Sequence, residues 1–169
     1  GGIRYPKPGD YGNCAFAAEA RKLWEMGVDG LKLFAKPTVQ GSFKLPLDAP
    51  PFMELYGYCQ QQDVPVLFHV GDPATFWHRD RVPDWALANG WYYGDGDYPA
   101  YDSQYDACER FMEKFPGLRI VFPHFFFMAD DLPRLAAIMR RHPRMMLDIT
   151  PGSELYFQLG ENPVEGRRF

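Results

Sequence analysis

The sequence predicts an α/β fold built on a parallel sheet. Along its 169 residues, segments typical of helices alternate with segments typical of strands. Such alternation indicates βαβ units, whose strands run parallel. Two apolar strand segments, 64–72 and 118–124, each carry a histidine near the C-terminal end, His69 and His124. Because ligands bind at the C-terminal ends of the strands in parallel sheets, the two histidines indicate a shared site.

Residues that favour helix N-termini mark where several of the predicted helices begin. Asn13 is a favourable N-cap for the first helix. Ser103 and Asp106 form a capping-box pattern ahead of the third. Asp130 or Asp131 begins the fourth. The predicted elements are a loop over 1–12, a helix over 14–26, a strand over 30–36, a polar loop from 37, a helix from 48 that includes Cys59, a strand within 64–72, a long loop over 71–102, a helix over 103–115, a strand over 118–124, a helix over 130–142, a strand over 145–150 and a helical start after 152.

Composition and charge narrow the class of partner. The net charge is -4 and no basic block is present, so nucleic acid and anionic membranes are not expected partners. No apolar segment approaches the length of a membrane span, and no signal peptide opens the chain. Three widely spaced cysteines without a C-x-x-C motif favour free thiols in a reducing cytoplasm. We expect one cytoplasmic domain over residues 1–169 that acts on a small molecule, with homo-oligomerisation left open.

The connection over 71–102 is far longer than most loops. Loops of this length are often lids or binding loops. This one is unusually rich in aromatic residues: Phe76, Trp77, Trp85, Trp91, Tyr92, Tyr93, Tyr98 and Tyr101. We therefore expect it to lie at the C-terminal face of the sheet and to contribute to binding. Residues 83–88 within it have the pattern of a short helix.

His69 and His124 are the candidate metal ligands, because neutral imidazole is the commonest protein ligand and a common general base. A hydrogen-bonded core histidine is the alternative for either one. Asp148 lies in an apolar strand at the same end of the sheet, as a catalytic group or as an acceptor that supports the site. Asp72, which follows the His69 strand, has the same two interpretations. His142, at a helix C-terminus, is predicted to lie at the surface.

One lysine and two aromatic positions are the candidates for substrate binding. Lys32 has three interpretations: an ion pair inside the sheet, a group that binds an anionic substrate, or a metal ligand if carbamylated. Lys32 and Lys36 alternate with apolar residues of the first strand and so share one face of it. Lys36, at the strand exit, is the better candidate to hold a substrate carboxylate, with plain solvent exposure as its alternative. Phe125 begins an apolar run after His124, which would be core packing or a wall of the site. Together with Trp77 it would shape a pocket for a planar or aromatic substrate.

Four segments taken together resemble strands four to seven of the amidohydrolase superfamily. These are residues 30–33, 64–69, 118–124 and 146–150. The resemblance is to the amidohydrolase-related branch that includes aminocarboxymuconate-semialdehyde decarboxylase and dicarboxylate lactonases. It implies a TIM-type (β/α)₈ barrel with a divalent metal at its C-terminal face, most often zinc, with manganese as an alternative. A whole barrel needs about 250 residues, so the resemblance implies a partial barrel of about four βα units.

Residue by residue, the resemblance assigns His69 as the strand-five metal ligand. His124 matches the strand-six histidine, a ligand or a catalytic group beside the metal. Lys32 falls where other branches carry a carbamylated lysine, which this branch generally does not use. The family's strand-one His-x-His pair and strand-eight aspartate have no counterpart in the chain. Pro123 also departs from the small residue expected before the strand-six histidine.

The function implied is metal-dependent hydrolysis of a small organic substrate, such as a cyclic or aromatic carboxylate. The metal would lower the pKa of a bound water and polarise a carbonyl, while His124 would stabilise or protonate the developing charge. A decarboxylase on the same fold is one alternative. A non-catalytic module that binds a small molecule, with structural histidines, is another. Since the ligand set is incomplete, we expect this stretch alone to be inactive or nearly so.

Overall fold

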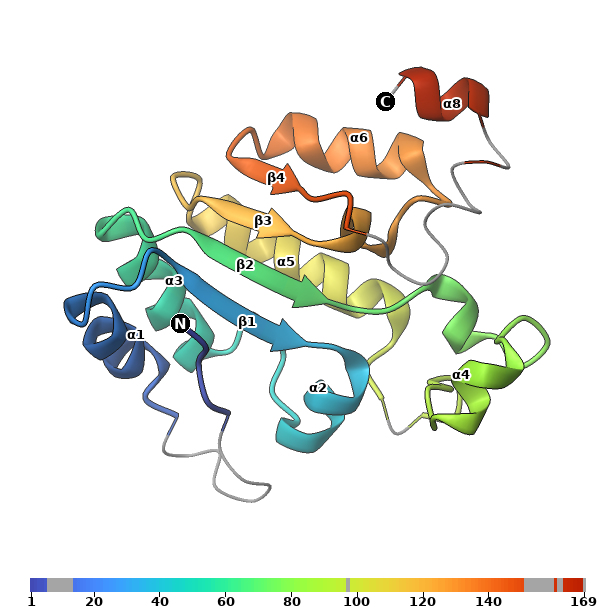
Figure 1. Ribbon diagram of the computed structural model, residues 1–169, viewed down its shortest axis with the longest axis horizontal. Coiled ribbons are helices and arrows are strands. Elements are labelled where there is room, and N and C mark those ends of the chain that lie inside the picture. Colours follow the sequence, from blue (N-terminus) through green and yellow to red (C-terminus); the bar gives the residue numbers. More distant parts are fainter. Residues whose placement is uncertain (6–13, 97, 151–159, 161–162, 169) are drawn as a thin grey trace.

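Four parallel strands form the sheet in the computed structural model, which describes residues 1–5, 14–96, 98–150, 160 and 163–168 (Figure 1). The strands are β1 (Leu31–Ala35), β2 (Val66–Val70), β3 (Ile120–Phe122) and β4 (Met145–Leu147). They are ordered β1-β2-β3-β4, and every neighbouring pair is parallel. Sequential order with parallel pairing requires a crossover after each strand. The predicted α/β class with a parallel sheet is confirmed.

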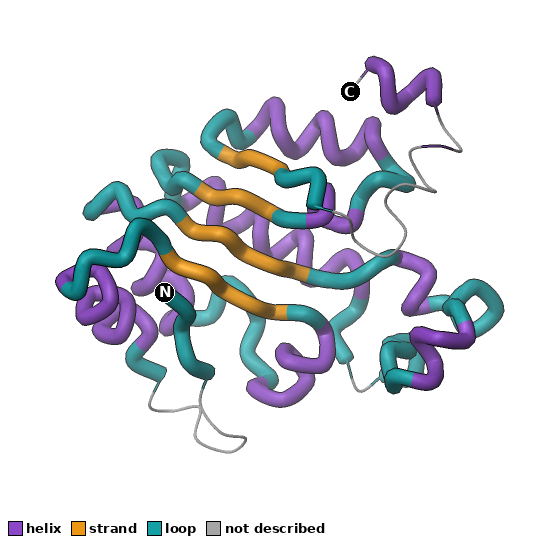
Figure 2. The backbone as a smooth tube through the Cα atoms, in the orientation of Figure 1, coloured by secondary structure: helices purple, strands orange, loops and turns teal. Residues whose placement is uncertain are grey.

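The helices between the strands lie largely on one side of the sheet, with α3 and α5 behind it in Figure 1. Further helices and 3₁₀ turns cluster at the C-terminal strand ends, as the backbone tube of Figure 2 also shows. The helical elements are α1 (Phe16–Glu25), α2 (Pro37–Phe43), α3 (Pro50–Gln61), η2 (Ala74–Trp77), α4 (Asp84–Ala88), α5 (Tyr101–Lys114), η3 (His124–Phe127), α6 (Leu132–Arg141) and α8 (Pro163–Arg168). None of the described helices is long and apolar enough to cross a membrane.

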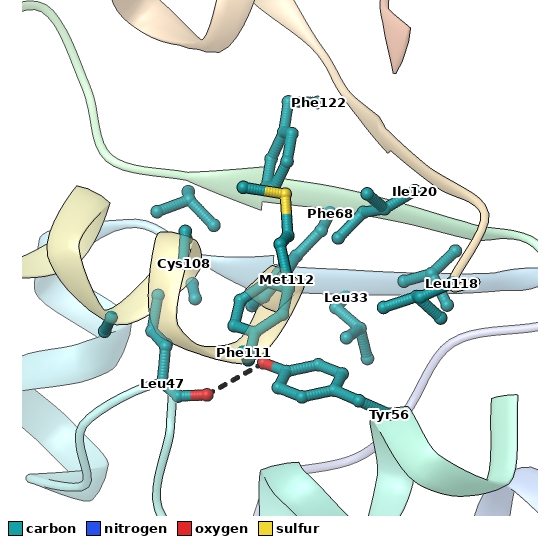
Figure 3. Packing of buried hydrophobic residues seen from close by; sticks show 14 of the residues in the cluster. Leu33, Leu47, Tyr56, Phe68, Cys108, Phe111, Met112, Leu118, Ile120 and Phe122 are labelled. Atoms are coloured by element: carbon teal, nitrogen blue, oxygen red, sulfur yellow. Dashed lines mark hydrogen bonds between the residues drawn. The ribbon is translucent and has the colours of Figure 1, made fainter. Parts of the chain in front are cut away.

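Alternate strand residues build the core between the sheet and the helices. Leu33 and Phe68 are fully buried, and both point toward α3 and α5 (Figure 3). Tyr56 of α3 stacks on Phe111 of α5, with ring centroids 4.1 Å apart. Its hydroxyl donates a 2.9 Å hydrogen bond to the Leu47 carbonyl, so this buried polar group is satisfied.

The opposite face of the sheet is much more exposed. Phe34 of β1 is 38% exposed and Met146 of β4 is 45% exposed. His69 of β2 lies on this face between them. Strand residues point alternately to the two sides of the sheet, and the preceding residue, Phe68, points into the core. Beside β1, Gly2 forms a parallel bridge to Lys32, within a stretch predicted to be a loop. The predicted alternation of residues 30–36 is confirmed.

Two boundary predictions were wrong. Residues 37–43, expected to be a polar loop, form α2, which starts at Pro37 and is followed by Lys44 in a left-handed conformation. Helix α5 begins at Tyr101 rather than after a Ser103 cap, and the Ser103 hydroxyl donates to the Ala100 carbonyl instead. The prediction for α6 is confirmed, since the Asp131 carboxylate caps the helix by accepting a hydrogen bond from the Arg134 amide.

Other expectations have mixed outcomes. The predicted Asn13 cap and the helical start after residue 152 lie outside the described residues. The short helix expected at 83–88 is confirmed as α4. His142 is only 8% exposed, so its predicted surface position is wrong. Its ring is covered where the chain turns from α6 into β4.

Candidate active site

The sheet brings His69 and His124 together at its C-terminal edge. His69 is the fourth residue of β2, and His124 follows β3 after Pro123. Their ring centroids are 5.1 Å apart, and the ring planes lie at 73° to each other. Neighbouring parallel strands lie 4.7–4.9 Å apart, so the C-terminal ends of β2 and β3 are close enough for such an approach. The structure therefore places the two predicted ligands in one site.

His69 is buried and presents a ring nitrogen to this site. It is 9% exposed, and among the described residues nothing hydrogen-bonds to its Nε2 atom. Burial, followed by the nearby His124 and Lys32, lowers the pKa of His69 to about 3. The imidazole is therefore neutral at pH 7 and has a lone pair available. A buried nitrogen without a partner is unfavourable unless a ligand satisfies it.

His124 is oriented by the end of β4. Its Nδ1 atom lies 3.1 Å from the Thr150 carbonyl oxygen, a contact that favours a proton on Nδ1 and leaves Nε2 as the lone-pair nitrogen. Its backbone amide donates to Asp148 Oδ1 at 3.1 Å. The same oxygen accepts hydrogen bonds from the Thr150 amide and hydroxyl, at 2.9 and 2.6 Å. Asp148 thus acts on backbone geometry around His124.

The charge state of Asp148 fits this role. Partial burial alone would raise its pKa, but the hydrogen bonds from Thr150 and the His124 amide outweigh burial and lower it. Asp148 is therefore an ionised acceptor at neutral pH. Its position just after β4, rather than inside the strand, corrects the predicted strand over 145–150.

A second acidic group, Asp72, lies beside His69. Its Oδ1 atom is 4.0 Å from His69 Nε2, and its Oδ2 atom accepts a 2.7 Å hydrogen bond from the Tyr93 hydroxyl. Lys36 Nζ is 4.0 Å from the same Oδ2 and 3.8 Å from the centre of the Trp91 ring. Burial raises the pKa of Asp72, while Tyr93 and Lys36 act against that rise. This cluster attaches the long connection to the ends of β1 and β2.

Aromatic rings surround the two imidazoles. Phe127 lies with its ring centroid 5.3 Å from that of His69 and 5.2 Å from that of His124. Phe34 covers His69 from β1 at 4.6 Å. Phe125 is instead 8% exposed and belongs to the core, and Trp77 packs against Tyr93 and Tyr101. Phe127 contacts both histidines, and Phe34 contacts His69.

The described residues fit a divalent metal only in part. Two imidazoles, of which that of His69 is neutral and has a buried Nε2 atom without a hydrogen-bond partner among the described residues, are the donor type that zinc prefers. Within the described part of the chain, however, no three His, Cys, Asp or Glu side chains gather closely enough to hold a metal. His69 and His124 would therefore supply two of the ligands, and further ones would be needed.

Sequence reasoning did not single out several residues of this site. Tyr93 and Trp91 were part of the aromatic set, but nothing local showed that they would reach Asp72 and Lys36. Phe127 was one of three successive phenylalanines, and only the turn of the backbone decides which one faces the histidines. Thr150 carried no signal, because its contribution is made partly by its backbone.

Four parallel strands in sequential order, with two histidines together at their C-terminal ends, have the arrangement of part of a TIM-type α/β barrel. Over 94% of the chain, the structure matches an uncharacterized TIM-barrel protein from Bordetella bronchiseptica, with 16% identity and a TM-score of 0.54. It also matches a protein from Staphylococcus aureus described as a candidate amidohydrolase, over 86% of the chain, with 13% identity and a TM-score of 0.52. At these identities the likeness shows the fold: four βα units of such a barrel.

The family follows from the sequence. A family model described as Amidohydrolase matches residues 7–161, so the chain belongs to the amidohydrolase family. The expected resemblance is confirmed. A search of curated proteins finds no match.

The chain spans about half the length of the structures that it matches. It covers 43% of the Bordetella protein and 53% of the Staphylococcus protein. It also covers 42% of a 5-carboxyvanillate decarboxylase from Novosphingobium aromaticivorans, complexed with manganese and 4-hydroxy-3-methoxy-5-nitrobenzoic acid, at 22% identity and a TM-score of 0.44.

Proposed function

We propose that the chain forms part of the active site of a metal-dependent hydrolase that acts on a small organic substrate. Two observations carry this proposal. The imidazoles of His69 and His124, from β2 and η3, lie together, and the buried Nε2 atom of His69, which lies 4.0 Å from Asp72 Oδ1, has no hydrogen-bond partner among the described residues. Family membership supports it. Residues 1–169 would belong to a single domain whose long connection contributes to the C-terminal face.

His69 and His124 would hold the metal, most suitably zinc, because imidazole nitrogen donors suit zinc better than manganese. When bound, the metal would lower the pKa of a water molecule and polarise a carbonyl of the substrate. His124 would hold its proton on Nδ1 against the Thr150 carbonyl. Asp148 would support catalysis by fixing the backbone at His124, rather than by touching the substrate.

Lys36 would hold a substrate carboxylate. Its ammonium group is mostly buried at the end of β1, beside the Trp91 ring, and faces Asp72 without a direct hydrogen-bond distance to it. A cation held in this way can exchange a weak ion pair for a closer one with the substrate. Trp77 and Phe125 would shape the pocket indirectly, through the rings that they support.

A decarboxylase is a second candidate, because the site combines a cation for a carboxylate with aromatic rings next to both imidazoles. An aromatic or unsaturated acid would suit these surroundings. A module that binds a small molecule without catalysis is the third candidate function, and it is compatible with the same contacts. The buried thiols Cys59 and Cys108 suit a reducing compartment such as the cytoplasm.

Two assays on one preparation distinguish these functions. The protein, with its natural flanking residues, is treated with a chelator and resupplied with zinc or manganese. Metal-dependent hydrolysis of activated esters or lactones supports the hydrolase, and metal-dependent carbon dioxide release from aromatic acids supports the decarboxylase. Absence of turnover by both routes would favour the binding module, provided that the His69→Ala variant is less stable than the wild type but keeps the same metal content. The 169-residue chain alone is expected to be inactive or nearly so.

A further inference from the structure

The chain makes an unusual turn directly after β3. Four consecutive residues, His124 to Phe127, have φ values of 58°, 57°, 56° and 51°. Residues other than glycine rarely adopt this left-handed region, and then usually singly. None of the four is a glycine or an asparagine. A run of this kind persists only where surrounding contacts hold it in place.

Helix α5 supplies contacts on one side of the turn. The Tyr105 hydroxyl donates to the Phe126 carbonyl at 3.1 Å, and the Tyr101 hydroxyl donates to the Phe127 carbonyl at 3.2 Å. The two tyrosines are four residues apart and so share one face of the helix. Burial raises the pKa of Tyr101 to about 12 and that of Tyr105 well above its usual value, so both hydroxyls remain neutral donors.

The end of β4 supplies the contacts on the other side. The Phe125 amide donates to the Asp148 carbonyl at 3.0 Å, and the His124 amide donates to the Asp148 carboxylate at 3.1 Å. The turn is thus held between α5 and Asp148 through successive backbone groups. Phe126 adds packing, since it stacks on Phe122 with ring centroids 3.9 Å apart.

Tyr105 also reaches the segment that follows β2. A side chain on Gly71 would begin 3.2 Å from the Tyr105 hydroxyl, and Gly71 has a φ of 76°. This position therefore requires glycine for both its conformation and its space. One tyrosine hydroxyl consequently lies where the chain leaving the His69 strand meets the chain leaving the His124 strand.

We propose that Tyr101 and Tyr105 are positioning residues of the site: they hold the left-handed turn that sets His124 and Phe127 against His69. Without the turn, the Phe127 ring would not lie within contact of both imidazoles. The role in metal binding rests on the proposed function. The role in placing the imidazoles does not.

The test uses Tyr101→Phe, Tyr105→Phe and the double variant, with Tyr58→Phe on α3 as the matched control. Imidazole proton shifts in the metal-free protein report the position of the Phe127 ring, because that ring faces both histidines. We expect the His69 and His124 signals to move in the double variant and to stay in place in the control. Unchanged signals in a folded double variant would overturn the proposal, since a tyrosine that only adds stability leaves native shifts alone.

Metal affinity separates this inference from the proposed function. With Co²⁺ as a visible probe, we expect the double variant to bind about 10- to 100-fold more weakly, as for other changes in groups that orient ligands. Co²⁺ binding as tight as in the wild type would contradict the positioning role. If the wild type binds no Co²⁺ but the imidazole signals still differ between the wild type and the double variant, the proposed function is rejected and the positioning role is supported.

The backbone conformation has its own test. Phe125→Gly and Phe125→Ala remove the same ring and differ mainly in their tolerance of positive φ. We expect the Gly variant to unfold at a higher urea concentration than the Ala variant, the reverse of their order in ordinary helices. An Ala variant as stable as the Gly variant, or more stable, would show that the turn is not left-handed.

Discussion

Tyr93 and Asp72 are joined by a buried 2.7 Å hydrogen bond across 21 residues of the long connection. Asp72 ends the segment that leaves β2, and Tyr93 comes from a small second core around Phe76. The bond therefore fixes that core above the sheet. It also leaves Asp72 with its other oxygen toward His69.

Removing this hydrogen bond should destabilise the protein. Tyr93→Phe leaves the ring in place but deprives a buried carboxylate of its donor, which typically costs about 1–3 kcal/mol. Urea unfolding measures the change in the free energy of unfolding. Tyr92→Phe, on the neighbouring residue, is the control and should have a smaller effect. Equal decreases in the free energy of unfolding in the two variants would show that the hydrogen bond to Asp72 does not contribute to stability.

Lys36→Met tests the substrate role of the lysine. If the ammonium holds a substrate carboxylate in the ground state and transition state alike, the variant raises KM with little change in kcat. We expect an increase of roughly 10- to 100-fold, the scale of one charge-assisted hydrogen bond. Lys44, an exposed lysine at the end of α2, provides the control as Lys44→Met. An unchanged KM would reject Lys36 as the anchor.

The depressed pKa of His69 predicts a pH dependence of stability in the metal-free protein. Between the ordinary value of 6.5 and the folded value of about 3, the unfolded chain binds a proton that the folded chain does not. The contribution of His69 is therefore complete above pH 6.5, and stability falls as the pH falls through this window, by at most about 1.4 kcal/mol per pH unit.

Urea unfolding of the metal-free protein at pH 7, 5.5 and 4.5 measures this slope. His69→Gln should flatten it, because the glutamine does not titrate. His78→Gln, which replaces an exposed histidine, is the matched control. A wild-type slope retained in His69→Gln would assign the acid sensitivity to another group.

The two faces of the sheet should respond differently to truncation. Phe68→Ala, on the fully buried face, should cost about 3–5 kcal/mol. Phe34→Ala, at 38% exposure, should cost less than about 1.5 kcal/mol in the 169-residue chain. If flanking residues close the barrel over this face, the cost of Phe34→Ala rises in the longer protein. Similar costs for both variants in the short chain would contradict the described burial.

Local sequence patterns were enough to predict most of the fold. The alternation in β1 and the apolar runs of β2 and β3 fix both the strands and their inner faces. Parallel pairing then brings the C-terminal ends of β2 and β3 to one edge of the sheet, and the left-handed turn after β3 completes the approach of His124 to His69. Helix α2 was missed because Gly41 and Ser42 are weak helix formers, and the burial of Gln40 and Phe43 supplies what propensity lacks.

The remaining parts of the site depend on contacts between distant residues. No local pattern links Tyr93 to Asp72, because the long connection has no regular period from which its path could be deduced. Three phenylalanines after His124 suggest an extended or core segment, and nothing in them signals positive φ. The turn depends on Tyr105, which is 21 residues away from the Phe126 carbonyl that it holds, and on Asp148, which is 23 residues away from the Phe125 amide that it holds.

Metal content is the most direct test of the central claim that His69 and His124 are metal ligands. Inductively coupled plasma mass spectrometry would be applied to the protein with its natural flanking residues, as wild type, His69→Asn and His124→Asn. We predict one divalent ion per chain in the wild type, lost from each variant while circular dichroism remains unchanged. No ion in the wild type, or an ion retained in both variants, would contradict the claim.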